Sequence, residues 1–387
     1  MIPADILRAR DLALDLARRT PNVIGVAIGG KETRGRHTGQ LAVQVFVDRK
    51  VAADVLAPGQ RIPDRIADIA TDVTLSHRPQ PLCASEGQLL SHGARNEDLS
   101  MHRPLVGGIA MGPANGGQGT LGGFVLDEDG NAYALTNRHV VMDDGPLPVI
   151  TCHQPAVTVR TAANSIIVSA ARTRIGEVTA HSPGDAVEVP DAAVIRLAPG
   201  GRWKAAVAGI GGVAGSNSLT YEQLVQIASP DGLCVQKRGS TTALTGGRIL
   251  AVGAKALPDG ATVTPTSPSY LGDYVVRPEG SGDRVFSLWG DSGSLVLDED
   301  RNVVGLLWGG PQKAGAYYNP GTETDAQLLD GTPPRYWDNW VTPIDDVLAS
   351  FQNPLDPTNP ALTLHVATAD EADLADVAVN TVPEVSP

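Results

Sequence analysis

Two segments of the same design lie about 170 residues apart in this chain, and they constrain its fold more than any other feature. The first, FVLDEDGNAYALT, begins at Phe124, and the second, LVLDEDRNVVGLLW, begins at Leu295. In each of them two apolar runs flank a short turn rich in Asp and Asn, which is the pattern of a β-hairpin. The separation is far larger than the 20–50 residues of solenoid repeats. We therefore predict two related β subdomains.

The region around the hairpins, from about residue 104 to 350, continues the same texture. Short runs rich in valine and isoleucine alternate there with turns, in a chain of 387 residues that contains 43 glycines and 29 prolines. Such alternation favours strands over helices, so this region is expected to be mainly β. A chain of this length allows two or three domains and a large core.

Residues 1–80 have a different character and are predicted to form a small α+β unit. Residues 4–19 show the apolar period of a helix. Val23–Ile28 and Leu41–Val47 are expected to be strands, and RIPDRIADIATDVTL, at 61–75, a short helix with a further strand.

Two further segments flank the β region. Residues 81–103 are predicted to be a linker. Residues 351–387 are predicted to be an acidic, partly disordered tail, because they carry acidic residues but neither lysine nor arginine.

Charge and cysteine content narrow the classes of partner. The net charge of −13 argues against a nucleic-acid partner, because phosphate binding needs a basic face. Cys83, Cys152 and Cys234 fit neither a disulfide framework nor a zinc pattern, which favours a reducing compartment. The first 20 residues lack the apolar core of a signal peptide, and no run approaches the roughly 20 apolar residues of a membrane span. We expect a cytoplasmic protein with no membrane partner.

Cofactor motifs are weak throughout. GVAIGGKET approaches a phosphate-binding loop, but Glu32 stands where that motif requires serine or threonine. No His-Glu-x-x-His or Cys-x-x-Cys pattern occurs. We therefore expect neither a metal nor a cofactor.

Three short segments carry residues suited to nucleophilic catalysis: LTNRHVV with His139, VEVPDAAVIRL with Asp191, and WGDSGS with Ser292. Each of these residues alone is more often structural. Together they are chemically complementary, because a serine hydroxyl needs a nearby base, and an imidazole needs a carboxylate that orients it. The backbone N–H groups of Gly290 and Ser292 are suited to stabilise a negative intermediate as an oxyanion hole, since Gly290 permits conformations that a side chain would obstruct.

The order and spacing of these residues resemble those of the chymotrypsin-like (trypsin-like) serine proteases. His139, Asp191 and Ser292 are separated by 52 and 101 positions. TNRHVV is similar to the TNxHV box of bacterial and plant members, DAAVIRL to the aspartate box, and GDSGS to GDSGG, with Ser294 in place of a glycine. The resemblance implies a double β-barrel, with barrel 1 at about 104–215 and barrel 2 at about 216–350. It also implies a serine endopeptidase that hydrolyses a polypeptide through an acyl-enzyme.

The substrate pocket is predicted from the same resemblance. GLLWGG is similar to the strand that lines the specificity pocket, with Leu307, Trp308 and Gly309 where the family often has Ser-Trp-Gly. Phe286, six positions before Ser292, would lie at the base of the pocket. No acid stands there, so we expect a preference for small or medium apolar side chains.

A narrower resemblance involves the N-terminal unit. Several diffuse segments are similar to the intracellular NARROW LEAF-type proteases and their bacterial relatives, among them VIGVAIGGKETRGRHTGQLAVQVFVDRKV, RPLVGGIAMG and VQKRGSTTALTGG. This resemblance implies an N-terminal α+β extension. Regulation, or assembly into a homo-oligomer through this extension, is one expectation for its role.

Three questions stay open at this stage. In secreted members of the family, the aspartate that corresponds to Asp291 pairs with a freed N-terminus. Here another internal group could hold it, the oxyanion hole could stay disordered until a trigger arrives, or the carboxylate could simply be hydrogen-bonded locally. The chain could also be a binding or scaffold protein on a protease fold, or an esterase-like hydrolase with the same triad. The absence of a Gly-x-Ser-x-Gly elbow disfavours the esterase alternative.

Overall fold

The structure is a computed structural model in which most of the chain outside several loops and the C-terminal end can be described. The described residues are 2–20, 22–33, 36–51, 54–76, 78–81, 100–114, 117–142, 149–156, 158–160, 165–167, 173–182, 190–219, 221–227, 232–257, 272–278, 286–311, 338–352, 354 and 359–372. Most of the expected linker and the last 15 residues of the acidic tail lie outside this set. No helix among the described residues has both the length and the apolar character needed to cross a bilayer.

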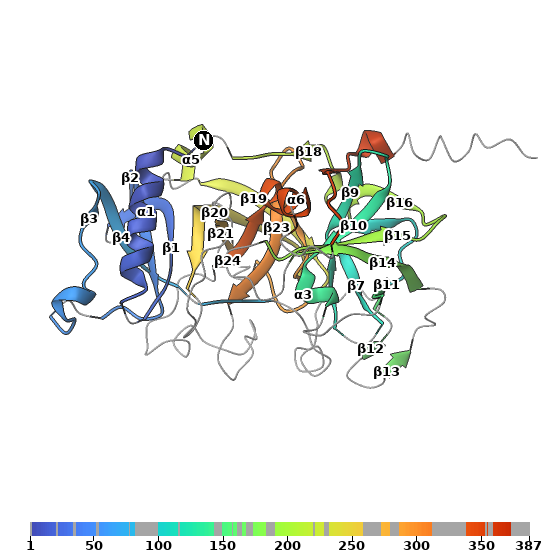
Figure 1. The fold of residues 1–387 in the computed structure, drawn as a ribbon, viewed down its shortest axis with the longest axis horizontal. Helices are drawn as coiled ribbons and strands as arrows, with labels where there is room; N and C mark the ends of the chain where they lie inside the picture. Colours follow the sequence, from blue (N-terminus) through green and yellow to red (C-terminus); the bar gives the residue numbers. More distant parts are fainter. Residues whose placement is uncertain are drawn as a thin grey trace, which may run out of the picture.

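The first sheet curls into a half-barrel, drawn at the right of Figure 1. Its strand order is β25-β9-β10-β15-β14-β11-β7-β8. The far end of this sheet returns to its middle, where the Thr136 hydroxyl at the end of β10 donates to the carbonyl oxygen of Thr120 in β8, at 2.8 Å. The strands are β7 (Ile109–Pro113), β8 (Gly119–Leu121), β9 (Gly123–Asp127), β10 (Ala132–Thr136), β11 (Thr151–His153), β14 (Arg174–His181), β15 (Ala193–Leu197) and β25 (Leu364–Val366).

A second, larger sheet holds the other half of the β region and the N-terminal strands. Its main path is β19-β22-β23-β24-β21-β20-β1-β2-β4-β3, and β5 and β18 pair with β23 off this path. The strands are β1 (Val23–Thr33), β2 (Arg36–Val47), β3 (Arg65–Ile66), β4 (Ile69–Leu75), β5 (Pro79–Pro81), β18 (Gly215–Ser216), β19 (Leu233–Gly239), β20 (Ala243–Ala256), β21 (Asp273–Pro278), β22 (Leu295–Leu297), β23 (Asn302–Pro311) and β24 (Asn339–Pro343).

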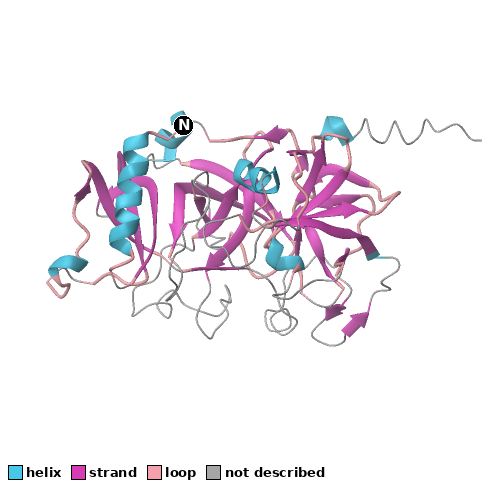
Figure 2. Ribbon diagram, in the orientation of Figure 1, coloured by secondary structure: helices cyan, strands magenta, loops and turns pink. Residues whose placement is uncertain are grey.

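Small elements complete the architecture (Figure 2). They are the helices α1 (Ala4–Ala17), α3 (Arg138–Val141), α5 (Tyr221–Ile227) and α6 (Ile344–Gln352), the 3-10 turn η1 (Pro58–Gln60), and the short strands β6 (Leu105–Gly107), β12 (Thr158–Arg160), β13 (Ser165–Ile167), β16 (Trp203–Val207) and β17 (Gly211–Gly212).

Both hairpins expected from the sequence are confirmed: β9 pairs with β10, and β22 with β23, each antiparallel. The two turns are built alike. Asp127 accepts from the amide of Asn131 at 2.8 Å, and Asp298 accepts from the amide of Asn302 at the same distance. An aspartate that bonds backbone amides further along the chain closes such a turn locally. The repeated DED segment therefore specifies the same turn in both sheets.

The N-terminal unit extends the second sheet. Strand β1 pairs antiparallel with β20 on one side and with β2 on the other. Helix α1 packs its apolar face on these strands, with Ala9, Ala13 and Leu14 buried. Strand β20 also pairs with β19, so the six strands β19-β22-β23-β24-β21-β20 close into a barrel, and β1 pairs with the end of β20 that extends beyond β19.

The segment at 61–75 differs from its prediction. It forms the strands β3 and β4, joined by a two-residue turn, and contains no helix in its described structure. Ala67 and Asp68 have φ values of 46° and 64°, the left-handed pair that a tight hairpin turn requires. The apolar spacing in this short segment fits both a helix and a strand, and pairing with β2 decides between them.

The apolar core between the two sheets joins them into one body. Val125 and Leu135 of the half-barrel lie in one cluster with Leu295 and Leu306 of the second sheet, and helix α6 adds Phe351. Within the acidic segment, β25 pairs with β9, so this part of the tail adds a strand to the half-barrel.

Candidate active site

His139 and Asp191 lie next to neighbouring strands of the half-barrel formed by the first sheet. His139 lies on the short helix α3, directly after β10, and Asp191 precedes β15. Strands β10 and β15 are antiparallel partners, with Thr136 opposite Ala193. This pairing brings the two predicted residues together, although 52 positions separate them.

The imidazole and the carboxylate are in direct contact. His139 Nδ1 is hydrogen-bonded to Asp191 Oδ2, and the His139 amide donates to Asp191 Oδ1 at 3.2 Å. Asn137 donates to the Asp191 carbonyl oxygen at 2.6 Å and fixes the backbone there. Burial acts to raise the pKa of Asp191, but the neighbouring His139 and its hydrogen bonds outweigh burial and hold that pKa below its ordinary value. The carboxylate is therefore kept ionised, as a group that orients an imidazole must be.

Ser292 lies in a sharp turn between two glycines that need their conformational freedom. Gly290 and Gly293 have φ values of 99° and 90°, a region that side chains disfavour. The turn is tied to β23, because the Gly293 amide donates to the carbonyl oxygen of Leu307 at 2.9 Å. The Ser292 hydroxyl donates to the carbonyl oxygen of Trp308 at 3.1 Å. The two glycines of WGDSGS thus allow the backbone conformation of this turn.

Thr120 of the half-barrel holds the Ser292 turn on its other side. Its amide donates to the Ser292 carbonyl oxygen at 2.8 Å, and its hydroxyl donates to the Gly290 carbonyl oxygen, also at 2.8 Å. Ser240 adds a second hydroxyl to the Gly290 oxygen, at 2.6 Å. Gly122 allows this approach, since a Cβ there would lie 2.1 Å from the Gly293 carbonyl oxygen. The motifs found in the sequence did not indicate Thr120. The signal that could have done so is its hydroxyl among the glycines of GTLGG, at 119–123.

The two halves of the candidate site thus meet around β8. Gly119 lies between Val140, the neighbour of His139, and the Ser292 carbonyl oxygen: a Cβ on it would be 2.5 Å and 3.1 Å from them. His139 Nε2 is buried and has no hydrogen-bond partner in the part of the chain that the structure describes. In serine hydrolases, the hydrogen bond from the serine hydroxyl to such an imidazole nitrogen is often formed only when substrate binds.

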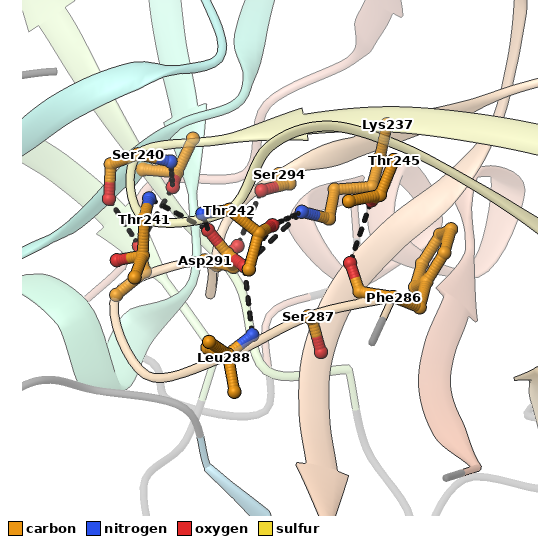
Figure 3. Close-up of polar contacts among 12 residues, drawn as sticks. Lys237, Ser240, Thr241, Thr242, Thr245, Phe286, Ser287, Leu288, Asp291 and Ser294 are labelled. Carbon is orange, nitrogen blue, oxygen red and sulfur yellow. Dashed lines mark hydrogen bonds and ion pairs between the residues drawn. The ribbon is translucent and has the colours of Figure 1, made fainter. Parts of the chain in front are cut away.

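Asp291, next to Ser292, is fully buried and is the centre of a hydrogen-bond network (Figure 3). Its Oδ1 accepts from the amides of Thr241 and Thr242, at 2.9 and 3.1 Å. Its Oδ2 accepts from the Leu288 amide at 2.9 Å, the Thr242 hydroxyl at 2.7 Å and the Lys237 ammonium at 3.2 Å. Of the three possibilities left open by the sequence, an internal group holds this carboxylate, together with local hydrogen bonds.

Lys237 is an uncommon residue to find in such a place. Both partners of the ion pair have no exposed side-chain surface. The ammonium also donates to the Thr242 hydroxyl and lies 5.7 Å from the centre of the Phe286 ring. Burial lowers the pKa of Lys237, while the charge of Asp291 acts in the opposite direction. A buried charge is tolerated when it is paired and hydrogen-bonded, and both conditions are met here.

The predicted pocket residues lie in two places: three of them are on β23, and Phe286 lies beside Lys237. Leu307 and Phe286 are fully buried in one apolar cluster of the second sheet. Trp308 donates its ring N–H to Asp273 at 3.0 Å, and Gly309 pairs with Trp340 of β24. The Phe286 ring thus belongs to the core beside Lys237, and its role at the base of a pocket stays a prediction.

Metal and thiol chemistry find little support among the described residues. No group of three or more His, Cys, Asp and Glu side chains converges there. Cys152 and Cys234 are free thiols, and burial raises the pKa of Cys152 to about 12, so that this thiol is unreactive. Cys83 lies outside the described residues.

Comparison with known proteins agrees with this geometry. Residues 119–306 match the family model described as a trypsin-like peptidase domain, a segment that contains His139, Asp191 and Ser292. The fold is mainly β and chymotrypsin-like, with a helix and strands before the matched segment. No curated protein matches the sequence.

Several bacterial proteases of known structure are similar. Thermobifida fusca Protease A is 16% identical, with 68% of this chain and 98% of that chain covered and a TM-score of 0.38. Nocardiopsis Protease is 18% identical over 63% and 95%, with a TM-score of 0.36. Cellulomonas bogoriensis chymotrypsin is 19% identical over 68% and 98%, with a TM-score of 0.38.

Proposed function

We propose that this protein is a serine endopeptidase in which Ser292 is the nucleophile, His139 the general base and acid, and Asp191 the orienting carboxylate. The observation that carries the proposal is the held contact between His139 and Asp191, set across β8 from a serine turn that both sheets fix. A serine positioned beside an oriented imidazole is the arrangement that acyl transfer needs.

The proposed reaction has two steps. His139 takes the hydroxyl proton of Ser292 while the oxygen attacks the substrate carbonyl, and the amine leaves with that proton. Water activated by His139 then hydrolyses the acyl-enzyme. The amides of Gly290 and Ser292 stabilise the oxyanion of both tetrahedral intermediates, each donor being worth roughly 3–4 kcal/mol. The Asp291 network supports this role, because it fixes the backbone on both sides of the turn.

The preferred substrate is a polypeptide with a small or medium apolar residue before the cleaved bond, acted on in the cytoplasm. Support for the side-chain preference comes from the absence of an acid at position 286. A panel of short peptides that differ only in this residue tests it. Faster cleavage after arginine than after alanine, valine or leucine contradicts the preference.

Activity is tested by labelling with a fluorophosphonate and by hydrolysis of casein-derived peptides. We expect the wild type to be labelled at Ser292. Ser292→Ala and His139→Ala should each lower turnover by about six orders of magnitude, and Asp191→Asn by about four. Ser216→Ala, at an exposed serine of β18, is the matched control and should change nothing. Unlabelled Ser292 in a folded protein would favour the binding or scaffold alternative, and hydrolysis of esters without peptides would favour the esterase alternative.

A further inference from the structure

The segment that leaves the N-terminal unit ends as a strand on the second sheet. Strand β5 pairs antiparallel with the C-terminal end of β23, with Pro81 opposite Gly309, Gln80 opposite Gly310, and Pro79 opposite Pro311. It follows β4 in the chain, so the N-terminal unit, whose strands β1–β4 already extend this sheet, also contacts β23 close to the Ser292 turn.

The edge that β5 takes is the one beside Ser292. A strand has two edges, and β24 occupies one of them at Gly309. Strand β5 therefore lies on the other edge, where Leu307 exchanges backbone hydrogen bonds with Gly293 and Ser294. The residue between Leu307 and Gly309 is Trp308, whose carbonyl oxygen accepts from the Ser292 hydroxyl. The pairing of β5 thus begins one residue away from the contact of the candidate nucleophile.

An extended peptide commonly binds a protein by adding a strand to a sheet edge. A polypeptide that presents its backbone carbonyl to Ser292 needs such an edge next to this serine, and β5 already fills it. We propose that β5 is an internal occupant of the substrate-binding edge of β23, which an extended polypeptide substrate must displace. This inference rests on the proposed function and adds regulation to the same site.

The pairing of β5 is weak by construction. Pro79 and Pro81 have no backbone N–H, so Gln80 is the one residue of this strand that can donate to β23. Prolines are tolerated in such a strand because it lies at a sheet edge. A substrate without prolines brings more donors to the same edge and is therefore able to compete.

The segment before β5 is anchored more firmly than β5 itself. The Ser76 hydroxyl donates to Asp338 at 2.6 Å, and Asp338 forms an ion pair with Arg277, also at 2.6 Å. Arg78 donates to the carbonyl oxygen of Leu257. A tether of this kind keeps the occupant at a high effective concentration, typically in the millimolar range for short links. Strand β5 can leave the edge while its anchor stays in place.

The consequence is a difference between large and small substrates. When an occupant fills a site for nine-tenths of the time, the apparent affinity of a competitor falls roughly tenfold. A small agent that modifies Ser292 without pairing to β23 does not compete with β5, so its reaction is not slowed. We therefore expect β5 to slow extended peptides without slowing such an agent.

The test uses the full chain with Gln80→Pro, which removes the N–H donor of β5, and Gln80→Ala, which keeps it. We expect Gln80→Pro to raise kcat/KM for an extended apolar peptide about tenfold, mainly through KM, and to leave the labelling rate by diisopropyl fluorophosphate unchanged. Gln80→Ala should behave as the wild type. An unchanged kcat/KM in Gln80→Pro, or an equal rise for the peptide and the small agent, would overturn the proposal.

A binding measurement separates this inference from the proposed function. In the Ser292→Ala background, the same peptide should bind more tightly to Gln80→Pro than to the unmodified edge, by calorimetry, whether or not the wild type is a peptidase. A cross-link provides the opposite perturbation. Cysteines at the paired positions, Pro79→Cys with Pro311→Cys, should block peptide binding when oxidised and restore it when reduced. Equal binding to the oxidised and reduced forms, with the disulfide shown by mass spectrometry, would refute it.

Discussion

The buried pair of Lys237 and Asp291 gives the sharpest energetic prediction. Both side chains have no exposed surface, and the ammonium nitrogen lies 3.2 Å from the carboxylate oxygen. Lys237→Met keeps a similar apolar length but removes the positive charge. The carboxylate then stays buried, with its amide and hydroxyl donors but without its counter-ion.

The expected cost follows from the burial of both partners. Removing one member of a fully buried ion pair typically costs about 3–5 kcal/mol, since the charge that remains is uncompensated. The backbone amides around Asp291 act to reduce this cost, so we expect a value near 3 kcal/mol. With an unfolding entropy of about 2 cal/mol/K per residue, each kcal/mol lowers the Tm of a 387-residue chain by roughly 1 °C, so the variant should melt about 3–4 °C below the wild type.

A double-mutant cycle assigns the cost to the pair. Lys237→Met, Asp291→Asn and the double variant are unfolded in guanidinium chloride and followed by tryptophan fluorescence. We expect the double variant to cost less than the two single variants added together, by about 1–3 kcal/mol, because each single change leaves a buried charge that the double change removes. Lys204→Met, at an exposed lysine of β16, is the control and should cost less than about 0.5 kcal/mol.

The same variants report on the Ser292 turn. If Lys237 fixes this turn through Asp291, fluorophosphonate labelling of Ser292 should slow in Lys237→Met and recover in part in the double variant. A cost below 1 kcal/mol for Lys237→Met, or strictly additive costs in the cycle, would refute the reasoning.

Two further predictions concern other parts of the molecule. Gly122→Ala would place a Cβ 2.1 Å from the Gly293 carbonyl oxygen, so it should displace the Ser292 turn, lower the stability by about 1–3 kcal/mol and slow the labelling of Ser292. Gly59→Ala, whose Cβ would lie in open space, is the control and should have none of these effects. Equal behaviour of the two variants in thermal melts and labelling would contradict this prediction. Burial, with repulsion from Asp273 and Asp345, raises the pKa of Asp346 from 3.8 to about 7, so stability falls as pH rises from about 4 to about 7 and the full penalty applies above pH 7. Asp346→Asn should therefore stabilise the protein above pH 7, by up to roughly 4 kcal/mol, and give no gain below about pH 4; a gain independent of pH in denaturant unfolding would contradict the assignment.

Most of the features that the sequence could predict depend on residues close to one another in the chain. The two hairpins are specified by their own turn residues, Asp127 and Asp298, and both form as expected. The contact between His139 and Asp191 follows once β10 and β15 are neighbours, because each residue lies at the end of its strand.

The features that could not be predicted depend on pairing between distant segments. Nothing in the neighbourhood of Lys237 indicates that its ammonium reaches Asp291, 54 positions away. The hydroxyl of Thr120 is one of many until β8 is placed beside the Ser292 turn. The segment at 61–75 is too short for its apolar spacing to distinguish helix from strand, and its partner β2 decides the outcome.

The continuity between β1 and β20 has a consequence for how this chain can be divided. A fragment that begins after residue 80 would lose β1 and leave the pairing groups of β20 exposed to solvent along the register from Ala251 to Ala256. Bare edges of this kind recruit other chains and promote aggregation. The part of the chain after residue 80 is therefore not a self-contained unit, because the N-terminal helix and strands cover the edge of its second sheet.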